Sequence, residues 1–152
     1  MNAPQSWVVL DSPSLRARLQ QLALPDDLLD GHWVNDEADA ADAVAALEFA
    51  DNAIQLRPFD KTVGSPVLVD FLHGKTGFRA QRFSHEMIVK AVAGRSKEPL
   101  TVVDATAGLG RDGFLLAAAG HKVTLIERHP VIATLLADGL FRAAQDGEMS
   151  TV

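Results

Sequence analysis

The stretch Val103-Asp104-Ala-Thr-Ala-Gly108-Leu-Gly110-Arg-Asp-Gly113-Phe114 decides the fold of this chain. The apolar, β-branched run at 100–103 before it predicts a strand, and the apolar run at 114–119 after it predicts a helix. Glycine tolerates positive φ and lets other groups approach the backbone closely, so Gly108 and Gly110 suit a tight turn. The stretch therefore predicts a strand, a glycine turn and a helix in succession.

The same pattern continues toward the C-terminus. Gly120 ends the helix, residues 122–126 predict a second strand that ends at Glu127, and Pro130 suits the first position of a helix that runs to about 144. The expected apolar stripe of that last helix is Ile132, Leu135, Leu136, Leu140 and Ala143. Upstream, a helix is expected at 85–93, capped by Ser84 and closed by Gly94. Alternating strands and helices indicate a parallel sheet covered by helices, which is an α/β fold.

Two acidic residues fall at the ends of the two predicted parallel strands. Glu127 lies 19 residues after Gly108, and an acid at this position can accept hydrogen bonds from both hydroxyls of a ribose. Asp104 ends the first strand and is expected to face the same crevice. The N–H groups at the start of the following helix are available to polar ligand atoms. The arrangement predicts a nucleoside-bearing cofactor across this edge of the sheet.

Two cofactors are compatible with the glycine turn. Gly108-Leu-Gly110-Arg-Asp-Gly113 matches the dinucleotide pattern G-x-G-x-x-G. However, Asp-Ala-Thr-Ala separates Val103 from the first glycine, and Asp104 would repel a pyrophosphate. This looser turn after a strand-end acid favours S-adenosyl-L-methionine (SAM). An NAD-type oxidoreductase fragment and a non-catalytic binding module stay open as alternatives.

The first part of the chain predicts a small α+β lobe. Its expected elements are a strand at 7–10, a helix at 14–24 ended by Pro25, a weakly helical segment at 36–46, a hairpin around Asp51-Asn52 and a strand at 67–72. Residues 1–66 are expected to form this lobe, and residues 67–152 the first part of a Rossmann-like domain.

Composition excludes several classes of site. The chain has 152 residues, no cysteine and a net charge of −6, so disulfides and thiolate metal sites are absent. Its five histidines lack metal-ligand spacing, and no metal site is expected. No apolar run reaches the roughly 18 residues of a membrane span, and no secretory signal is visible, so a cytoplasmic protein is expected. Residues 1–60 hold eleven acids and three bases, whereas residues 61–152 hold nine acids and eleven bases.

From residue 103 to residue 144 the sequence resembles the ribosomal RNA small subunit methyltransferase J family, whose members methylate guanine N2. The motifs that carry the resemblance are the stretch at 103–114, Glu127-Arg128-His-Pro-Val131, Leu135-Leu-Ala-Asp-Gly-Leu140, Val69-Asp-Phe71 and Lys90-Ala-Val92. It implies a Rossmann-like class I SAM-dependent methyltransferase fold, with SAM as cofactor and small-subunit rRNA or the 30S subunit as partner. Cofactor contacts in the family fall on the positions of Arg111, Asp112, Glu127 and Arg128.

The sequence departs from the family in two places. The segment between 71 and 90 lacks the family's run of glycines. It carries Arg79 and Arg82 beside Phe78 and Phe83, which are candidates for RNA binding or, alternatively, parts of a solvated loop. The family also continues past Val152 into the part that positions the target amine. The resemblance therefore leaves the catalytic residues unassigned and predicts a C-terminally incomplete fold with little activity alone.

Overall fold

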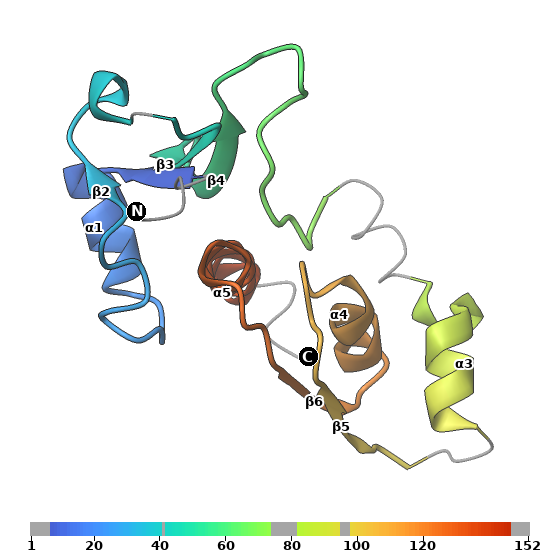
Figure 1. Ribbon diagram of the computed structural model, residues 1–152. Helices are drawn as coiled ribbons and strands as arrows, with labels where there is room; N and C mark the ends of the chain where they lie inside the picture. The colour runs from blue at the N-terminus through green and yellow to red at the C-terminus, as the bar shows by residue number, and fades with distance from the viewer. Residues whose placement is uncertain (1–6, 41, 74–81, 95–97, 147–152) are drawn as a thin grey trace. The chain divides into compact units, whose positions relative to one another are not determined.

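A computed structural model describes residues 7–40, 42–73, 82–94 and 98–146 of the chain (Figure 1). These residues belong to two compact units, Met1–Val69 and Asp70–Val152. Arg79, a predicted RNA-binding residue, lies outside the described residues. In the parts of the chain that are described, no helix has both the length and the apolar character needed to cross a membrane.

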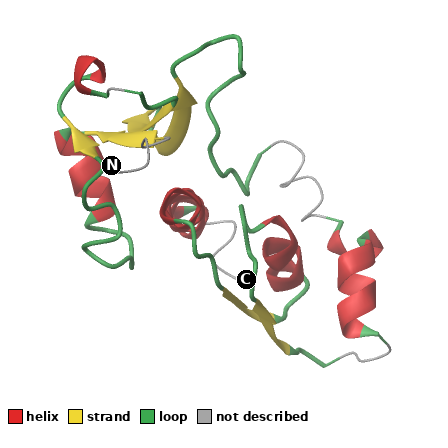
Figure 2. Ribbon diagram, viewed as in Figure 1, coloured by secondary structure: helices red, strands yellow, loops and turns green. Residues whose placement is uncertain are grey.

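The first unit is built on a four-stranded mixed sheet with strand order β2-β1-β3-β4 (Figure 2). Its strands are β1 (Trp7–Leu10), β2 (Trp33–Val34), β3 (Ala45–Ala50) and β4 (Ala53–Pro58). β1 pairs in parallel with both β2 and β3, while β3 and β4 form an antiparallel hairpin. The strand at 7–10 and the hairpin are thus confirmed. Asp51 and Asn52 form its turn with φ of 49° and 61°, a conformation that these two residue types tolerate.

Strand β1 occupies an inner position of this sheet because its residues are apolar on both faces. Val8 is 2% exposed and Val9 is fully buried. Such a continuous apolar run is typical of a strand that is covered on both sides. Val8 packs in one core cluster with Ala40 and Ala46.

The structure corrects the predicted helices of this unit. Helix α1 spans only Pro13–Leu19, because tight turns follow it and carry Leu22 into the core with 8% exposure. The only helical structure among the described residues of the acidic segment at 36–46 is a short 3-10 turn, η1 (Glu37–Asp39), which the side chain of Asp36 caps. Ala45 and Ala46 pair with β1 instead, so sheet pairing overrides the helical preference of alanine.

The predicted strand at 67–72 is also wrong. Val67 makes only an isolated antiparallel bridge with Leu56. Val69 and Phe71 are 4% and 2% exposed, so these apolar residues are buried by packing rather than by a sheet. Apolar residues at alternate positions indicate that side chains are buried, and at 67–72 this burial occurs without strand pairing.

The second unit contains a parallel βαβ arrangement followed by a long helix. In chain order its elements are η2 (Phe83–His85), α3 (Met87–Ala93), β5 (Thr101–Asp104), α4 (Arg111–Ala118), β6 (Lys122–Leu125) and α5 (Pro130–Gln145). β5 and β6 pair in parallel from Thr101↔Lys122 to Asp104↔Leu125, with α4 as the crossover. The order and type of the expected elements are confirmed. The starts of two helices differ: α4 begins at Arg111, three residues before the expected start, and α3 begins at Met87 after Glu86, while Ser84 lies in η2.

The core of this unit lies between α4 and the two strands. Leu115 and Leu116 of α4 pack with Val89 of α3, and Val102 and Val123 of the strands join them. The stripe expected for α5 is partly wrong, since Leu140 is 38% exposed. The buried residues of α5 are Val131, Thr134, Leu135, Leu136, Asp138, Gly139 and Ala143. Two polar residues therefore take positions that the apolar pattern did not indicate.

Candidate cofactor-binding site

The turn after β5 is held against the end of β6 by backbone hydrogen bonds. Ala107 N–H donates to the carbonyl of Ile126 at 3.0 Å, and Ile126 N–H donates to the carbonyl of Asp104 at 2.9 Å. The carboxylate of Asp104 accepts a hydrogen bond from Thr106 N–H at 3.1 Å. These bonds fix the turn at the carboxyl ends of the two parallel strands, the edge at which α/β sheets bind ligands.

The glycines of this turn have different roles. Gly108 has φ of +54° and open space around the position of a Cβ, so its requirement is conformational. Gly110 has φ of +73° and is buried, and a Cβ there would overlap Leu136 and approach Cζ of Phe71 at 3.2 Å. Gly113 has no positive φ, but a Cβ there would overlap the side chain of Leu125. A Cβ at Gly110 or at Gly113 would thus point into the core, which explains on packing grounds why both positions hold glycine.

Helix α4 begins at this turn without a side-chain cap. Gly110 is its N-cap residue and takes a left-handed conformation, so no side-chain oxygen accepts from the first N–H groups. The positive end of the helix and these N–H groups are consequently open to polar ligand atoms. Asp112 lies in the first turn, where its charge is favourable to the helix dipole.

A pocket of about 360 Å³ opens beside this turn. Its lining residues are Asp104, Thr106, Ala107, Leu109, Arg111 and Asp112. The structure thus brings together three of the predicted site residues, Asp104, Arg111 and Asp112. Thr106, Ala107 and Leu109 were not predicted, and the only signal that could have found them is their place inside the glycine turn.

Glu127 follows the end of β6 and is held by two backbone donors. Its Oε2 accepts from Gly108 N–H at 3.0 Å, and its Oε1 accepts from His129 N–H at 2.7 Å. The N–H of His129 lowers the pKa of this carboxyl, burial opposes that shift, and the N–H groups of Gly108 and Arg128 lower the pKa further. Each carboxylate oxygen accepts one of the bonds from Gly108 and His129, and because a carboxylate offers about four lone-pair sites, acceptor capacity remains for hydroxyl donors.

The other predicted residues lie around this centre. Glu127 does not line the pocket, but it reaches the glycine turn through Gly108, so the site extends over both strand ends. Arg128 is the next residue and is exposed. Arg82 is exposed, directly precedes η2, and is not among the residues that line the pocket. Within those residues, no three His, Asp or Glu side chains gather closely enough to hold a metal ion.

Relatives of this chain carry methyltransferase names. It is 47% identical over 112 residues to a protein from Tolumonas auensis and 37% identical over 150 residues to one from Vibrio parahaemolyticus, both named ribosomal RNA small subunit methyltransferase J. These matches cover 72% and 97% of this chain but 45% and 54% of the relatives. The chain therefore spans about half the length of the curated relatives that it matches.

A solved structure confirms the Rossmann-like methyltransferase fold. The crystal structure of a SAM-dependent methyltransferase from Neisseria gonorrhoeae matches with a TM-score of 0.67 and 29% identity, over 94% of this chain and 55% of that protein. The family described as putative SAM-dependent methyltransferases matches residues 34–152. This match indicates SAM rather than a dinucleotide as the cofactor. The chain belongs to the family of putative SAM-dependent methyltransferases.

Proposed function

We propose that this chain forms the cofactor-binding part of an enzyme that transfers a methyl group from SAM to N2 of a guanosine in small-subunit rRNA. The observation that carries the proposal is the hydrogen bond between Glu127 and Gly108, which couples a strand-end carboxylate to the glycine turn. The names of the relatives supply the substrate class. We assign residues 1–66 to an accessory lobe and residues 67–152 to the SAM-binding domain, in a cytoplasmic protein.

The residues of the site fit SAM better than a dinucleotide. Asp104 and Asp112 place two carboxylates around a pocket with one cation, Arg111. A pyrophosphate would meet like charge there, whereas the methionine end of SAM carries an ammonium group and a carboxylate. We assign the ammonium to Asp104, and the methionine carboxylate to Arg111 and the N-terminus of α4.

We assign the nucleoside end of the cofactor to the end of the neighbouring strand, β6. The free lone pairs of Glu127 accept the two ribose hydroxyls, while the N–H groups of Gly108 and His129 keep the carboxylate oriented. Arg128 lies beside it and is exposed, so it is placed to contact the rim of the adenosine. Asp104, Glu127 and the glycine turn thus hold the cofactor at both ends.

When bound, SAM supplies a methyl group on a positively charged sulfur. An amine such as N2 of guanine would accept this methyl group, with the carbon–sulfur electron pair remaining on sulfur and a proton of the amine passing to solvent. This chain contributes to the step by holding the donor in place, because alignment of the reacting atoms supplies much of the rate. We assign no described residue to the target amine.

Calorimetric titration with S-adenosylhomocysteine and, separately, with NADH tests the cofactor assignment. We expect saturable binding of S-adenosylhomocysteine and none of NADH. Binding of NADH alone would support the oxidoreductase alternative, and binding of neither would support a non-catalytic module. Substrate assignment is tested separately, by incubating the protein with small ribosomal subunits and SAM carrying a labelled methyl group. Because no described residue is assigned to the target amine, we expect only a low level of label from this chain; label at guanine N2 supports the proposal, whereas label on another base or on protein contradicts it.

A further inference from the structure

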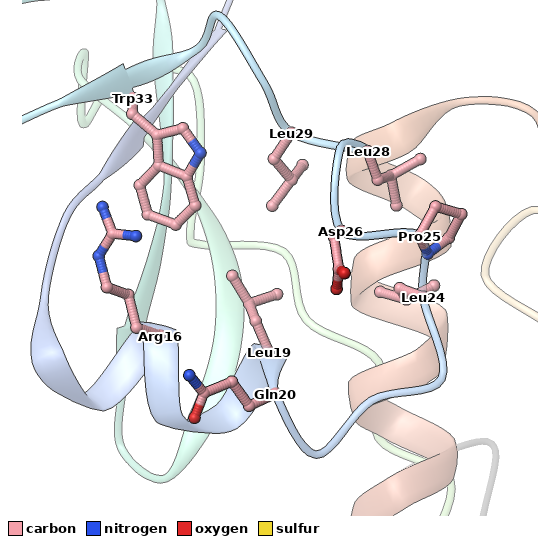
Figure 3. Close-up of a pocket in the computed structure, with 9 residues that line it drawn as sticks. All are labelled: Arg16, Leu19, Gln20, Leu24, Pro25, Asp26, Leu28, Leu29 and Trp33. Carbon is pink, nitrogen blue, oxygen red and sulfur yellow. The ribbon is translucent and has the colours of Figure 1, made fainter.

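The first unit contains a pocket that the methyltransferase site does not use (Figure 3). It lies between α1, the loop that follows it and β2, and has a volume of about 170 Å³. Four leucines and Trp33 supply its apolar wall, and the polar groups are Arg16, Gln20 and Asp26. Drug-sized ligands occupy pockets of about 300–1,000 Å³, so this one has room for a single long side chain.

The cation in the pocket is already neutralised. Arg16 donates two hydrogen bonds to the carboxylate of Asp11, each at 2.6 Å. Its guanidinium also lies over the ring of Trp33, 4.4 Å from the centroid. Held by both partners, Arg16 forms part of the wall and offers little charge to an incoming anion.

Asp26 differs from Arg16, because no hydrogen bond or ion pair joins its carboxylate to another described residue. Figure 3 shows this carboxylate directed toward the space between Leu19, Leu29 and the loop at 24–26. Asp27 and Asp30 lie on the same loop and are exposed. The loop beside the pocket therefore carries three exposed carboxylates, one of which, that of Asp26, lines the pocket itself.

The rest of the unit has the same sign of charge. Residues 1–69 hold eleven acids and four bases. Two of the three arginines are paired inside the unit, Arg16 with Asp11 and Arg57 with Glu48 and Glu37, while Arg18 bonds the side chain of Asn52. Such a surface repels the phosphates of RNA and attracts cationic partners.

We propose that this pocket binds one lysine or arginine side chain of a basic protein segment. The aliphatic stem of such a side chain packs on the leucines and Trp33, and its cationic end pairs with Asp26. This proposal rests on the proposed function in one respect, which is the identity of the partner. A small ribosomal subunit would offer both RNA and basic proteins. In this proposal the first unit binds a protein partner, and the second unit makes the contacts with RNA.

Fluorescence anisotropy of the whole chain with a labelled hexalysine peptide tests this docking without any methyl donor. We expect saturable binding that Asp26→Asn weakens by about threefold to fivefold, the size of an exposed ion pair. Asp51→Asn is the matched control, because it removes the same charge from the same unit at an exposed hairpin turn that favours asparagine. We expect this control to bind as the unchanged chain does.

A second variant tests the cavity rather than the charge. Gln20 lines the pocket and is exposed, so Gln20→Trp fills the space without altering the net charge, and we expect peptide binding to be abolished. Equal weakening by Asp26→Asn and Asp51→Asn, or undisturbed binding by Gln20→Trp, would overturn the proposal. Binding of an RNA oligonucleotide that Gln20→Trp abolishes would also overturn it. Binding of S-adenosylhomocysteine in the same samples keeps this result separate from the proposed function.

Discussion

The carboxylate of Glu127 accepts a hydrogen bond from the backbone N–H of Gly108, with 3.0 Å between Oε2 and N. The two residues lie 19 positions apart, yet they join the ends of two parallel strands at the turn that shapes the pocket. The second oxygen of Glu127 accepts from His129 N–H. One side chain therefore orders the glycine turn, and in the function proposed above it also presents acceptors to a ribose.

The first prediction concerns the charge and geometry of Glu127. In Glu127→Gln the amide NH₂ must face either Gly108 N–H or His129 N–H, so one acceptor is replaced by a donor that opposes another donor. We expect affinity for S-adenosylhomocysteine to fall on the order of tenfold or more, measured by calorimetry. Asp39→Asn, at an exposed position of η1, is the control and should leave affinity unchanged. Equal affinity in both variants would refute the role given to Glu127.

The second prediction concerns pH. The pKa of Glu127 is lowered in the folded chain, chiefly by His129 N–H, relative to about 4.3 for an unperturbed glutamate. A lowered folded pKa means that the carboxylate contributes stability above the unfolded pKa and that this contribution is lost as pH falls through the folded pKa. Urea unfolding at a series of pH values should show Glu127→Gln less stable than the unchanged chain at pH 7. The difference should shrink below about pH 4.3; a constant difference down to acid pH would contradict this.

The third prediction concerns the contact between α4 and β6. Alanine in place of a helical glycine normally stabilises by about 1 kcal/mol. At Gly113 the added Cβ overlaps Leu125, so Gly113→Ala should instead destabilise by about 1–3 kcal/mol in urea unfolding. In a Leu125→Ala background the same change should be neutral or stabilising, because the overlapping atoms are gone. The absence of any coupling in this double-mutant cycle would disprove the close contact.

The fourth prediction separates the two glycines of the turn. Gly108→Ala meets only the conformational cost of its positive φ, about 1–2 kcal/mol, because nothing lies near its Cβ position. Gly110→Ala adds overlap with Leu136, a further cost of about 1–3 kcal/mol. Thermal unfolding should therefore rank Gly110→Ala as clearly less stable than Gly108→Ala. The reverse order would show that the turn is packed differently.

The fifth prediction concerns RNA. We expect combined charge reversal of Arg79 and Arg82 to weaken binding of an rRNA fragment, and to reduce the slope of log K against log salt by about 0.7 for each phosphate that the protein no longer neutralises. Filter binding at several salt concentrations measures both quantities. Lys61→Glu, an exposed change in the acidic first unit, is the control. An unaltered slope in the double variant would assign these arginines to a solvated loop.

The order of elements in the second unit was readable from the sequence because its signals are local. The run at 100–103, the glycines and Pro130 each constrain the backbone within a few residues of themselves, so β5, α4, β6 and α5 were found with small errors at their ends. The spacing of Glu127 from Gly108 also indicated the site, since parallel strands bring their carboxyl ends to one edge.

Other features depended on contacts between distant segments. The sequence could not show that Ala45 and Ala46 pair with β1, or that Val69 and Phe71 are buried without a strand. Nor could it show that Gly110 and Gly113 face Leu136 and Leu125, which gives them a packing role distinct from that of Gly108. The whole chain determines which residues meet in the core. A residue's intrinsic preference for helix or strand is overridden where strand pairing and packing lower the free energy by more.

The sequence by itself therefore determined the α/β class, the glycine turn and the presence of an acid, Glu127, after the next strand. Only the tertiary structure decided that Glu127 bonds Gly108, that the pocket is lined by Thr106, Ala107 and Leu109, and that a second pocket forms around Asp26. The physical reason is that the two kinds of feature depend on interactions of different range along the chain. Turn and strand propensities act along the backbone, whereas a pocket exists only when side chains from separate elements close around the same space.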